Sequence, residues 1–275
     1  MKLSKKLLTG ATIIAACTMG ASAANAGLIT KWGVDVVSDF DVIDTTISGG
    51  NIQSIGGGLL SWNGPSDDGG DPQSSVVQHL NGGTGAVGTQ TTALSTMAFT
   101  DGAAVDGLSL THNNVVINGT PTLTIVLNDS VTLTPLEPVV GPPFPPQLFD
   151  FNVEFVETLN SLSGDACPSG QDAGGCADIF VLTDPEGLSF TTPAIMGFKY
   201  TVTLDVIGLA FLSDDACEAA GVASGCQGII TNEGGATTID TLITITSMEV
   251  PEPAALGLLG LGLIGLGAAR RRRRS

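Results

Sequence analysis

The chain has 275 residues, of which 43% are apolar and 13% are charged, and its formal net charge is −17. That length and apolar content allow one large domain with a sizeable core. Only two basic residues remain between residues 27 and 248, against 25 acidic ones, so the formal charge of this region is near −23. We exclude nucleic acid as a partner, because phosphate binding depends on Lys and Arg.

The first 26 residues have the pattern of an export signal. Lysines precede a short apolar stretch at residues 7–16, which we expect to form a signal helix. Ala24 and Ala26 fit the small-x-small rule for signal peptidase, which makes Gly27 the first residue of the mature chain. A rival interpretation takes Cys17, in a lipobox-like context, as the site of a lipid anchor.

A glycine-rich turn gathers three carboxylates, those of Asp67, Asp68 and Asp71. Calcium prefers oxygen-rich loops of this kind, so the turn is a candidate calcium site. Calcium is the only cofactor that the sequence suggests. The turn lacks the spacing of an EF-hand, and a solvated acidic turn is the alternative interpretation.

Strand-like runs occupy most of the mature region, separated by turn formers such as Asn118-Gly119. The runs that we predict as strands are 34–37, 59–62, 108–117, 123–127, 149–156, 179–182, 200–207, 209–212 and 237–246. Phe149 to Val156 alternates apolar and polar residues, which is typical of a strand with one face in the core. We therefore predict an all-β fold, an antiparallel β-sandwich of jelly-roll-like type.

The two histidines, His79 and His112, lie in no recognisable catalytic motif. Neither Gly-x-Ser-x-Gly nor His-Glu-x-x-His occurs, so we predict no enzymatic activity. We interpret His112 as a structural imidazole that bonds a turn, with ligand binding, metal binding and catalysis as alternatives. Glu154 and Glu157 suggest an acid/base pair for glycoside chemistry, but a three-residue spacing on a strand places them on opposite faces.

Residues 138–146 read Pro-Val-Val-Gly-Pro-Pro-Phe-Pro-Pro. Proline has no backbone donor, so this segment cannot lie inside a sheet. We expect an extended crossover loop that links two sheets or divides an N-terminal half from a C-terminal half.

Four cysteines form an internal repeat in which two Asp-Ala-Cys units are offset by 50 residues. In each unit a second cysteine follows nine positions later. Of the three pairings open to four cysteines, the local one fits the repeat best: Cys167–Cys176 and Cys217–Cys226. The export signal places these thiols in an oxidising compartment. A metal site is the alternative, although the spacing does not suit zinc and no histidine lies nearby.

The C-terminal segment, residues 249–275, has three parts. Pro251, Glu252 and Pro253 come first, an apolar stretch at 254–269 follows, and a stop-transfer cluster closes it: Arg270, Arg271, Arg272, Arg273 and Arg274. Sixteen helical residues rise roughly 24 Å, short of a hydrocarbon core of ~30 Å, so the predicted transmembrane helix is a weak anchor. The arginines should stay cytoplasmic and leave the preceding region outside. An ordinary single-span anchor is the alternative.

This three-part order resembles the PEP-CTERM sorting domain. The resemblance implies that exosortase, a membrane cysteine protease of Gram-negative bacteria that make exopolysaccharide, cuts near the motif and passes the protein to the surface. The partners that we expect are the Sec translocon, signal peptidase and exosortase, with the inner membrane as a transient location and exopolysaccharide as a later contact. Residues 27–248 then form the secreted domain.

Thr111, His112 and Asn114 form a Thr-His-x-Asn motif. Together with segments 60–64 and 151–160 it resembles the THxN family of PEP-CTERM proteins. The family implies a common fold and no established activity. Leu159 stands where we would expect a proline, which puts only the local turn in doubt.

Our first hypothesis for function is an exported structural protein of the cell surface or extracellular matrix, associated with exopolysaccharide or biofilm. The second is a secreted module that binds carbohydrate or calcium, for which Trp32, Trp62 and Tyr200 would be the aromatic contacts. The third is a secreted hydrolase that uses His112 or Glu157.

Overall fold

The structure is a computed structural model that describes residues 27–65, 72–160, 166–170, 175–184, 188–250 and 261–262. The elements in these ranges are β1 (Lys31–Phe40), β2 (Thr46–Ser48), β3 (Asn51–Gly56), β4 (Leu59–Asn63), β5 (Ser74–Leu80), β6 (Ala93–Phe99), β7 (Val105–Asp106), β8 (Leu108–Asn113), β9 (Thr122–Glu137), β10 (Gln147–Val156), β11 (Asp178–Leu182), β12 (Ser189–Thr191), β13 (Phe198–Val206), β14 (Ala210–Phe211), α1 (Asp214–Ala219), β15 (Gln227–Thr231), β16 (Ala236–Ile239) and β17 (Thr241–Glu249).

The strands form three antiparallel sheets, which confirms the predicted all-β fold. An eight-stranded sheet has the order β14-β15-β11-β10-β9-β1-β6, with β2 also paired to β9. The others have the orders β16-β8-β5-β4-β3 and β12-β13-β17-β7. Only Gly107 separates β7 from β8 and only Asp240 separates β16 from β17, so these two sheets continue into each other. The described part of the chain contains more strands than the eight of a jelly roll.

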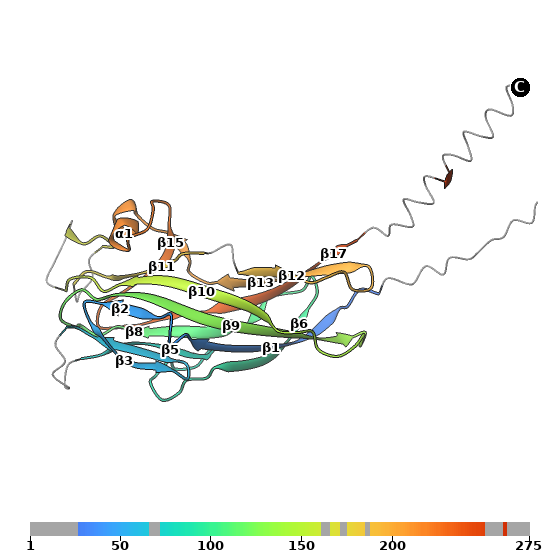
Figure 1. The fold of residues 1–275 in the computed structure, drawn as a ribbon, viewed down its shortest axis with the longest axis horizontal. Coiled ribbons are helices and arrows are strands. Elements are labelled where there is room, and N and C mark those ends of the chain that lie inside the picture. The colour runs from blue at the N-terminus through green and yellow to red at the C-terminus, as the bar shows by residue number, and fades with distance from the viewer. Residues whose placement is uncertain are drawn as a thin grey trace, which may run out of the picture.

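The core is built by alternation along the strands. β9 buries every second residue along most of its length, among them Leu123, Ile125 and Leu133, and β10 pairs with it from Gln147 to Val156. Buried side chains from all three sheets meet in one cluster, as expected for layers that face each other in a sandwich. Figure 1 shows the strands running along the long axis, with α1 near one end and the end of β17 at the other.

The proline-rich segment differs from our prediction of a crossover loop. β9 and β10 are neighbours in one sheet, so residues 138–146 connect the two strands of a hairpin. The physical reason is the length of β9, which runs on from the predicted 123–127 to Glu137 and takes Pro135 into the strand. The segment lies outside the strands, as expected from its missing donors.

Both predicted disulfides are present, Cys167–Cys176 and Cys217–Cys226. The first closes the connection between β10 and β11, and the second ties α1 to the residue before β15. Ser213 caps α1 by accepting a hydrogen bond from the amide of Ala216. Its hydroxyl also donates to the carbonyl of Pro168, so the two stapled segments touch.

Replacing both Cys167 and Cys176 by Ser should lower the free energy of unfolding by about 2–3 kcal/mol, because the closed loop restricts the unfolded chain. Urea denaturation of the oxidised protein, with and without the double substitution, measures this loss. Addition of reductant should remove the difference between the two proteins, and a difference that survives reduction would contradict the explanation.

Several predicted features lie outside the described residues. They are the cleavage-site residues Ala24 and Ala26, the alternative lipid site Cys17, the acidic turn of Asp67, Asp68 and Asp71, the motif Pro251, Glu252 and Pro253, and the arginine cluster 270–274. Across the described ranges, no helix has the length and apolar character needed to cross a membrane.

Candidate functional site

Three buried carboxylates meet where strands of the eight-stranded sheet end. Glu157 directly follows β10, Asp178 begins β11 and Glu233 lies two residues beyond β15. The strand pairing explains this arrangement, because Val156 is opposite Ile179 and Asp178 is opposite Thr231. One ligand oxygen from each residue lies within 4.8 Å of the others. We call Glu157, Asp178 and Glu233 the carboxylate cluster.

The cluster lies at the corner where the chain passes from one layer to the other. Glu233 belongs to the connection between β15 of the eight-stranded sheet and β16 of the five-stranded sheet. Asn114, just after β8, donates its backbone N–H to the carbonyl of Gly235 in the same connection. In Figure 1, β10 runs toward the end of the sandwich at which α1 lies, away from the end of β17.

Asp178 is held firmly by its neighbours. Its Oδ2 accepts a hydrogen bond from Asn114 Nδ2 at 2.7 Å, and its Oδ1 accepts one from the amide of Thr158 at 2.8 Å. The Thr158 hydroxyl donates to the carbonyl of Cys176, which ties this contact to the first disulfide loop. Burial raises the pKa of Asp178, and the hydrogen bond from the Thr158 amide opposes that rise.

Glu157 is buried among negative charges and lacks hydrogen bonds of the kind that hold Asp178. Its side chain is 0% exposed, and neither carboxylate oxygen accepts a hydrogen bond from a described residue. Burial, followed by the negative charges of Asp178 and Glu233, raises its pKa strongly, while nearby polar groups of Trp62 and Asn160 act in the opposite direction. The arrangement therefore opposes the ionised cluster unless a positive charge or a proton compensates it.

His112 lies beside this cluster in an aromatic cage. Its ring stacks on Trp62 at 5.6 Å between centroids and meets Phe155 and Phe180 edge-on at 5.4 and 4.9 Å. Nδ1 shares a hydrogen bond of 2.9 Å with the Thr231 hydroxyl. Burial lowers the pKa of His112 to about 3, so the ring is neutral at physiological pH. The structure thus corrects the prediction of a turn contact, because His112 bonds a strand across the layers.

The Thr-His-x-Asn motif divides between two sides of β8. Thr111 points away from the cluster, bonding His79 Nε2 at 2.7 Å and the Thr238 hydroxyl at 2.8 Å. On the other side, Asn114 donates a hydrogen bond to Asp178, and His112 shares one with Thr231. Asp178 and Thr231 are paired across β11 and β15. Successive side chains of a strand alternate between faces, which accounts for the division.

Asn160 completes the surroundings of the cluster. Its Nδ2 donates to the carbonyl of Ile117 at 3.1 Å, and its Oδ1 is buried with no hydrogen-bond partner. Gly175 lies against it with φ of 146°, and a Cβ there would stand 2.7 Å from the Asn160 Cα. Only glycine allows the stapled loop to approach this closely.

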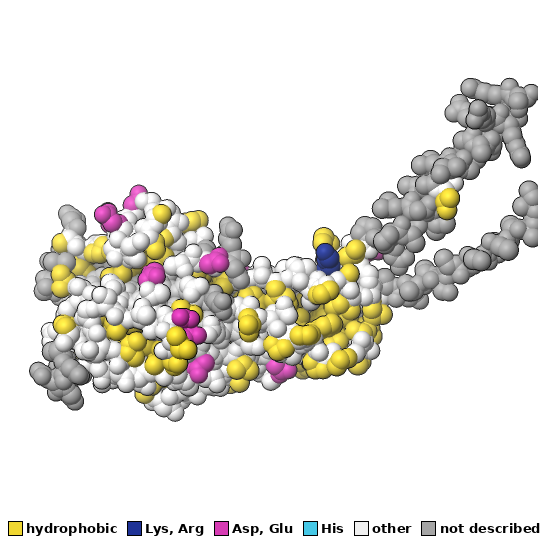
Figure 2. All heavy atoms as spheres, in the orientation of Figure 1, with side chains coloured by type: hydrophobic (Ala, Val, Ile, Leu, Met, Phe, Trp, Pro, Cys, Tyr) yellow, Lys and Arg dark blue, Asp and Glu magenta, His cyan; other side chains and the backbone are white. Residues whose placement is uncertain are grey.

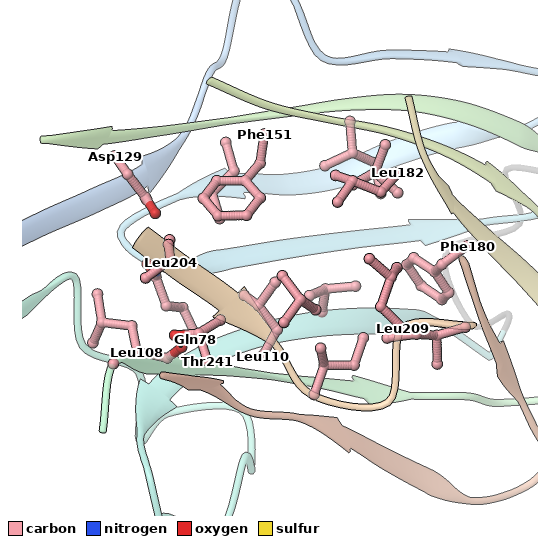
Figure 3. A pocket seen from close by; sticks show the side chains of 18 of the residues that line it. Gln78, Leu108, Leu110, Asp129, Phe151, Phe180, Leu182, Leu204, Leu209 and Thr241 are labelled. Carbon is pink, nitrogen blue, oxygen red and sulfur yellow. Dashed lines mark hydrogen bonds between the residues drawn. The ribbon is translucent and has the colours of Figure 1, made fainter. Parts of the chain in front are cut away.

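An apolar cavity of about 90 Å³ is lined by His112 and Phe180 of the aromatic cage and extends to Asp129 and Leu204 (Figure 3). Figure 3 shows Phe151 and Leu182 facing Leu110 and Leu209 across it, with Asp129 at one side. Ligand pockets usually measure about 300–1,000 Å³, so this space is too small for a typical organic ligand. We interpret it as imperfect packing between the layers.

The residues proposed for the alternative functions are buried. Trp32, Trp62 and Tyr200 are each 0% exposed, so none can stack on a sugar that approaches from solvent. Glu154 accepts a hydrogen bond from the Thr124 hydroxyl, whereas Glu157 joins the cluster, so the two glutamates do not face one bond. His112 is equally inaccessible. These findings weigh against the carbohydrate and hydrolase hypotheses in the form that the sequence suggested.

Comparison with known proteins bears on the C-terminal segment. Residues 249–274 match the family described as the PEP-CTERM protein-sorting motif. The motif indicates export and sorting to the cell surface, with exosortase as the processing partner. No curated protein matches the chain.

Proposed function

We propose that the mature protein is a non-enzymatic structural component of the cell surface or extracellular matrix, associated with exopolysaccharide or biofilm. The observation that carries the proposal is the PEP-CTERM motif at residues 249–274, which begins at Glu249, the last residue of β17. The two disulfides support it, because cross-links of this kind stabilise domains outside the cell. The resemblance of the Thr-His-x-Asn region to the THxN family is consistent with such a role.

The surface of the domain also suits an interaction role. Figure 2 shows hydrophobic side chains gathered toward the end of the body where β1 begins and β17 ends, with acidic groups over the rest of that face. Exposed apolar residues at this end include Phe99, Val139 and Met248. Exposed apolar patches mark surfaces that contact other molecules.

Fractionation of the producing cells tests the proposal. We expect the mature protein in the polymer fraction of the surface, and we expect a variant with Ala at 251, 252 and 253 to remain in the inner-membrane fraction. A variant with Asp205→Asn, at an exposed position of β13, should behave as the parent. Hydrolysis of the surface polysaccharide by the purified protein, abolished by His112→Ala, would contradict the non-enzymatic role.

A further inference from the structure

The two lysines of the described residues lie away from the carboxylate cluster, so neither balances the charge that its ionised form would carry. Lys31 and Lys199 are the only lysines or arginines between residues 27 and 250. Lys31 pairs with Glu137 at 3.5 Å, near the end of β9, whereas Glu157 contacts Pro121 just before β9 begins. That strand of 16 residues is roughly 50 Å long. Lys199 is opposite Met248 in another sheet.

The oxygens around the cluster form a set of acceptors. Glu157 offers two carboxylate oxygens that accept no hydrogen bond from described residues. Asn114 is 3% exposed, and its Nδ2 donates a hydrogen bond to Asp178, which holds the amide against the cluster. The Oδ1 of the same amide is buried and has no hydrogen-bond partner among the described residues. A buried acceptor without a donor costs free energy, and a bound cation at this place would offset that cost for several oxygens at once.

The kind of species follows from the ligand atoms. Glu157, Asp178 and Glu233 offer carboxylate oxygens, and among the described residues no nitrogen or sulfur ligand belongs to this group. Asn114 and Asn160 add buried amide oxygens. Hard cations prefer such ligands. Calcium accepts six to eight oxygens in flexible geometry, whereas magnesium retains several waters and is rarely held in a buried all-protein site.

We propose that Glu157, Asp178 and Glu233, with the amide oxygens of Asn114 and Asn160, bind a calcium ion. Asp178 is fixed for this role by Asn114 and the Thr158 amide, and Thr158 is fixed in turn by the first disulfide loop. Outer contacts of this kind orient metal ligands. The ion joins the ends of β10, β11 and β15 to Asn114 after β8, and so locks the two layers at their corner. The acidic turn of Asp67, Asp68 and Asp71 lies outside the described residues and takes no part in this proposal.

Thermal unfolding of the exported protein tests the site. At calcium about a hundredfold above the dissociation constant, Tm should rise by roughly 5–10 °C over the value in chelator, and magnesium should give a smaller shift. Glu157→Gln should abolish the shift. In chelator the same variant should be more stable than the parent, because the substitution removes a buried repelling charge. Glu154→Gln, on β10 three residues before Glu157 and outside the cluster, should keep the full shift.

Terbium luminescence gives a second readout that does not depend on stability. Trp62 lies beside Glu157 and stacks on His112, so it should sensitise terbium bound at the cluster. Trp62→Phe should remove the sensitised emission, Trp32→Phe should keep it, and calcium should displace the terbium. Trp32 is the matched control because it is equally buried and packs against Tyr200 instead.

Two results would overturn the calcium site. One is the absence of both a calcium-dependent Tm shift and sensitised emission. The other is a Glu157→Gln variant that fails to fold, or that is less stable than the parent by the same amount in chelator and in calcium. That result would show that the carboxylates share protons in a structural cluster and bind no ion. A parent protein that folds only with calcium would support the site more strongly than a Tm shift.

Discussion

Phe155→Ala should lower the free energy of unfolding by about 3–5 kcal/mol, a large share of the 5–15 kcal/mol that usually holds a domain together. Phe155 is 0% exposed and packs on Phe180 at 4.5 Å and Trp62 at 4.9 Å between ring centroids. Removal of its ring leaves a cavity between the layers and removes one of the aromatic rings that contact His112. Urea denaturation measures the loss.

Phe211→Ala provides the control, because this side chain is 74% exposed on β14. We expect its substitution to change stability by no more than about 0.5 kcal/mol. Equal losses from the two substitutions would mean that the aromatic cage is not the centre of the core.

Asp129→Asn should stabilise the protein at pH 8 and have little effect at pH 4. Burial raises the pKa of Asp129 to about 7, and the other titratable group that lines the cavity, His112, is neutral over this range. The unfolded chain loses this proton near pH 4, so between pH 4 and 7 the folded state binds more protons. Stability therefore falls as pH rises through this window, by up to about 4 kcal/mol, and the penalty is complete above pH 7.

The measurement is the difference in unfolding free energy between the parent and Asp129→Asn at several pH values in one buffer series. The carboxylate cluster contributes equally to both proteins and cancels in this difference. Asp205→Asn, at an exposed position of β13, should give no such trend. A difference that is constant from pH 4 to 8 would rule out Asp129 as its source.

The sequence predicted the parts of this fold that depend on local pattern. Alternation marked β10 and β13, and the repeated cysteine spacing marked both disulfides. β5 was missed because its buried residues include Ser74, Gln78 and His79, which a hydrophobicity pattern reads as surface. The strand order was also out of reach, since it is set by contacts between residues far apart in the chain.

The candidate site shows the same limit. His112, Asn114 and Glu157 were singled out from motifs, yet no spacing rule relates them to Asp178 or Glu233. Only the pairing of β10, β11 and β15 brings the three carboxylates together. Part of the signal was present in the sequence, because the predicted strands 149–156 and 179–182 place Glu157 and Asp178 at strand ends. No predicted strand ended within two residues of Glu233, which follows β15 in the structure.

Mass spectrometry of the C-terminus of the surface form tests the central claim, that the chain is an exosortase-sorted surface protein, most directly. We predict a terminus near Pro251–Pro253 and no peptide from the arginine cluster 270–274, and we predict that this processing disappears in a strain without exosortase. An intact arginine tail on the surface form, or the same cleavage in both strains, would contradict the sorting route.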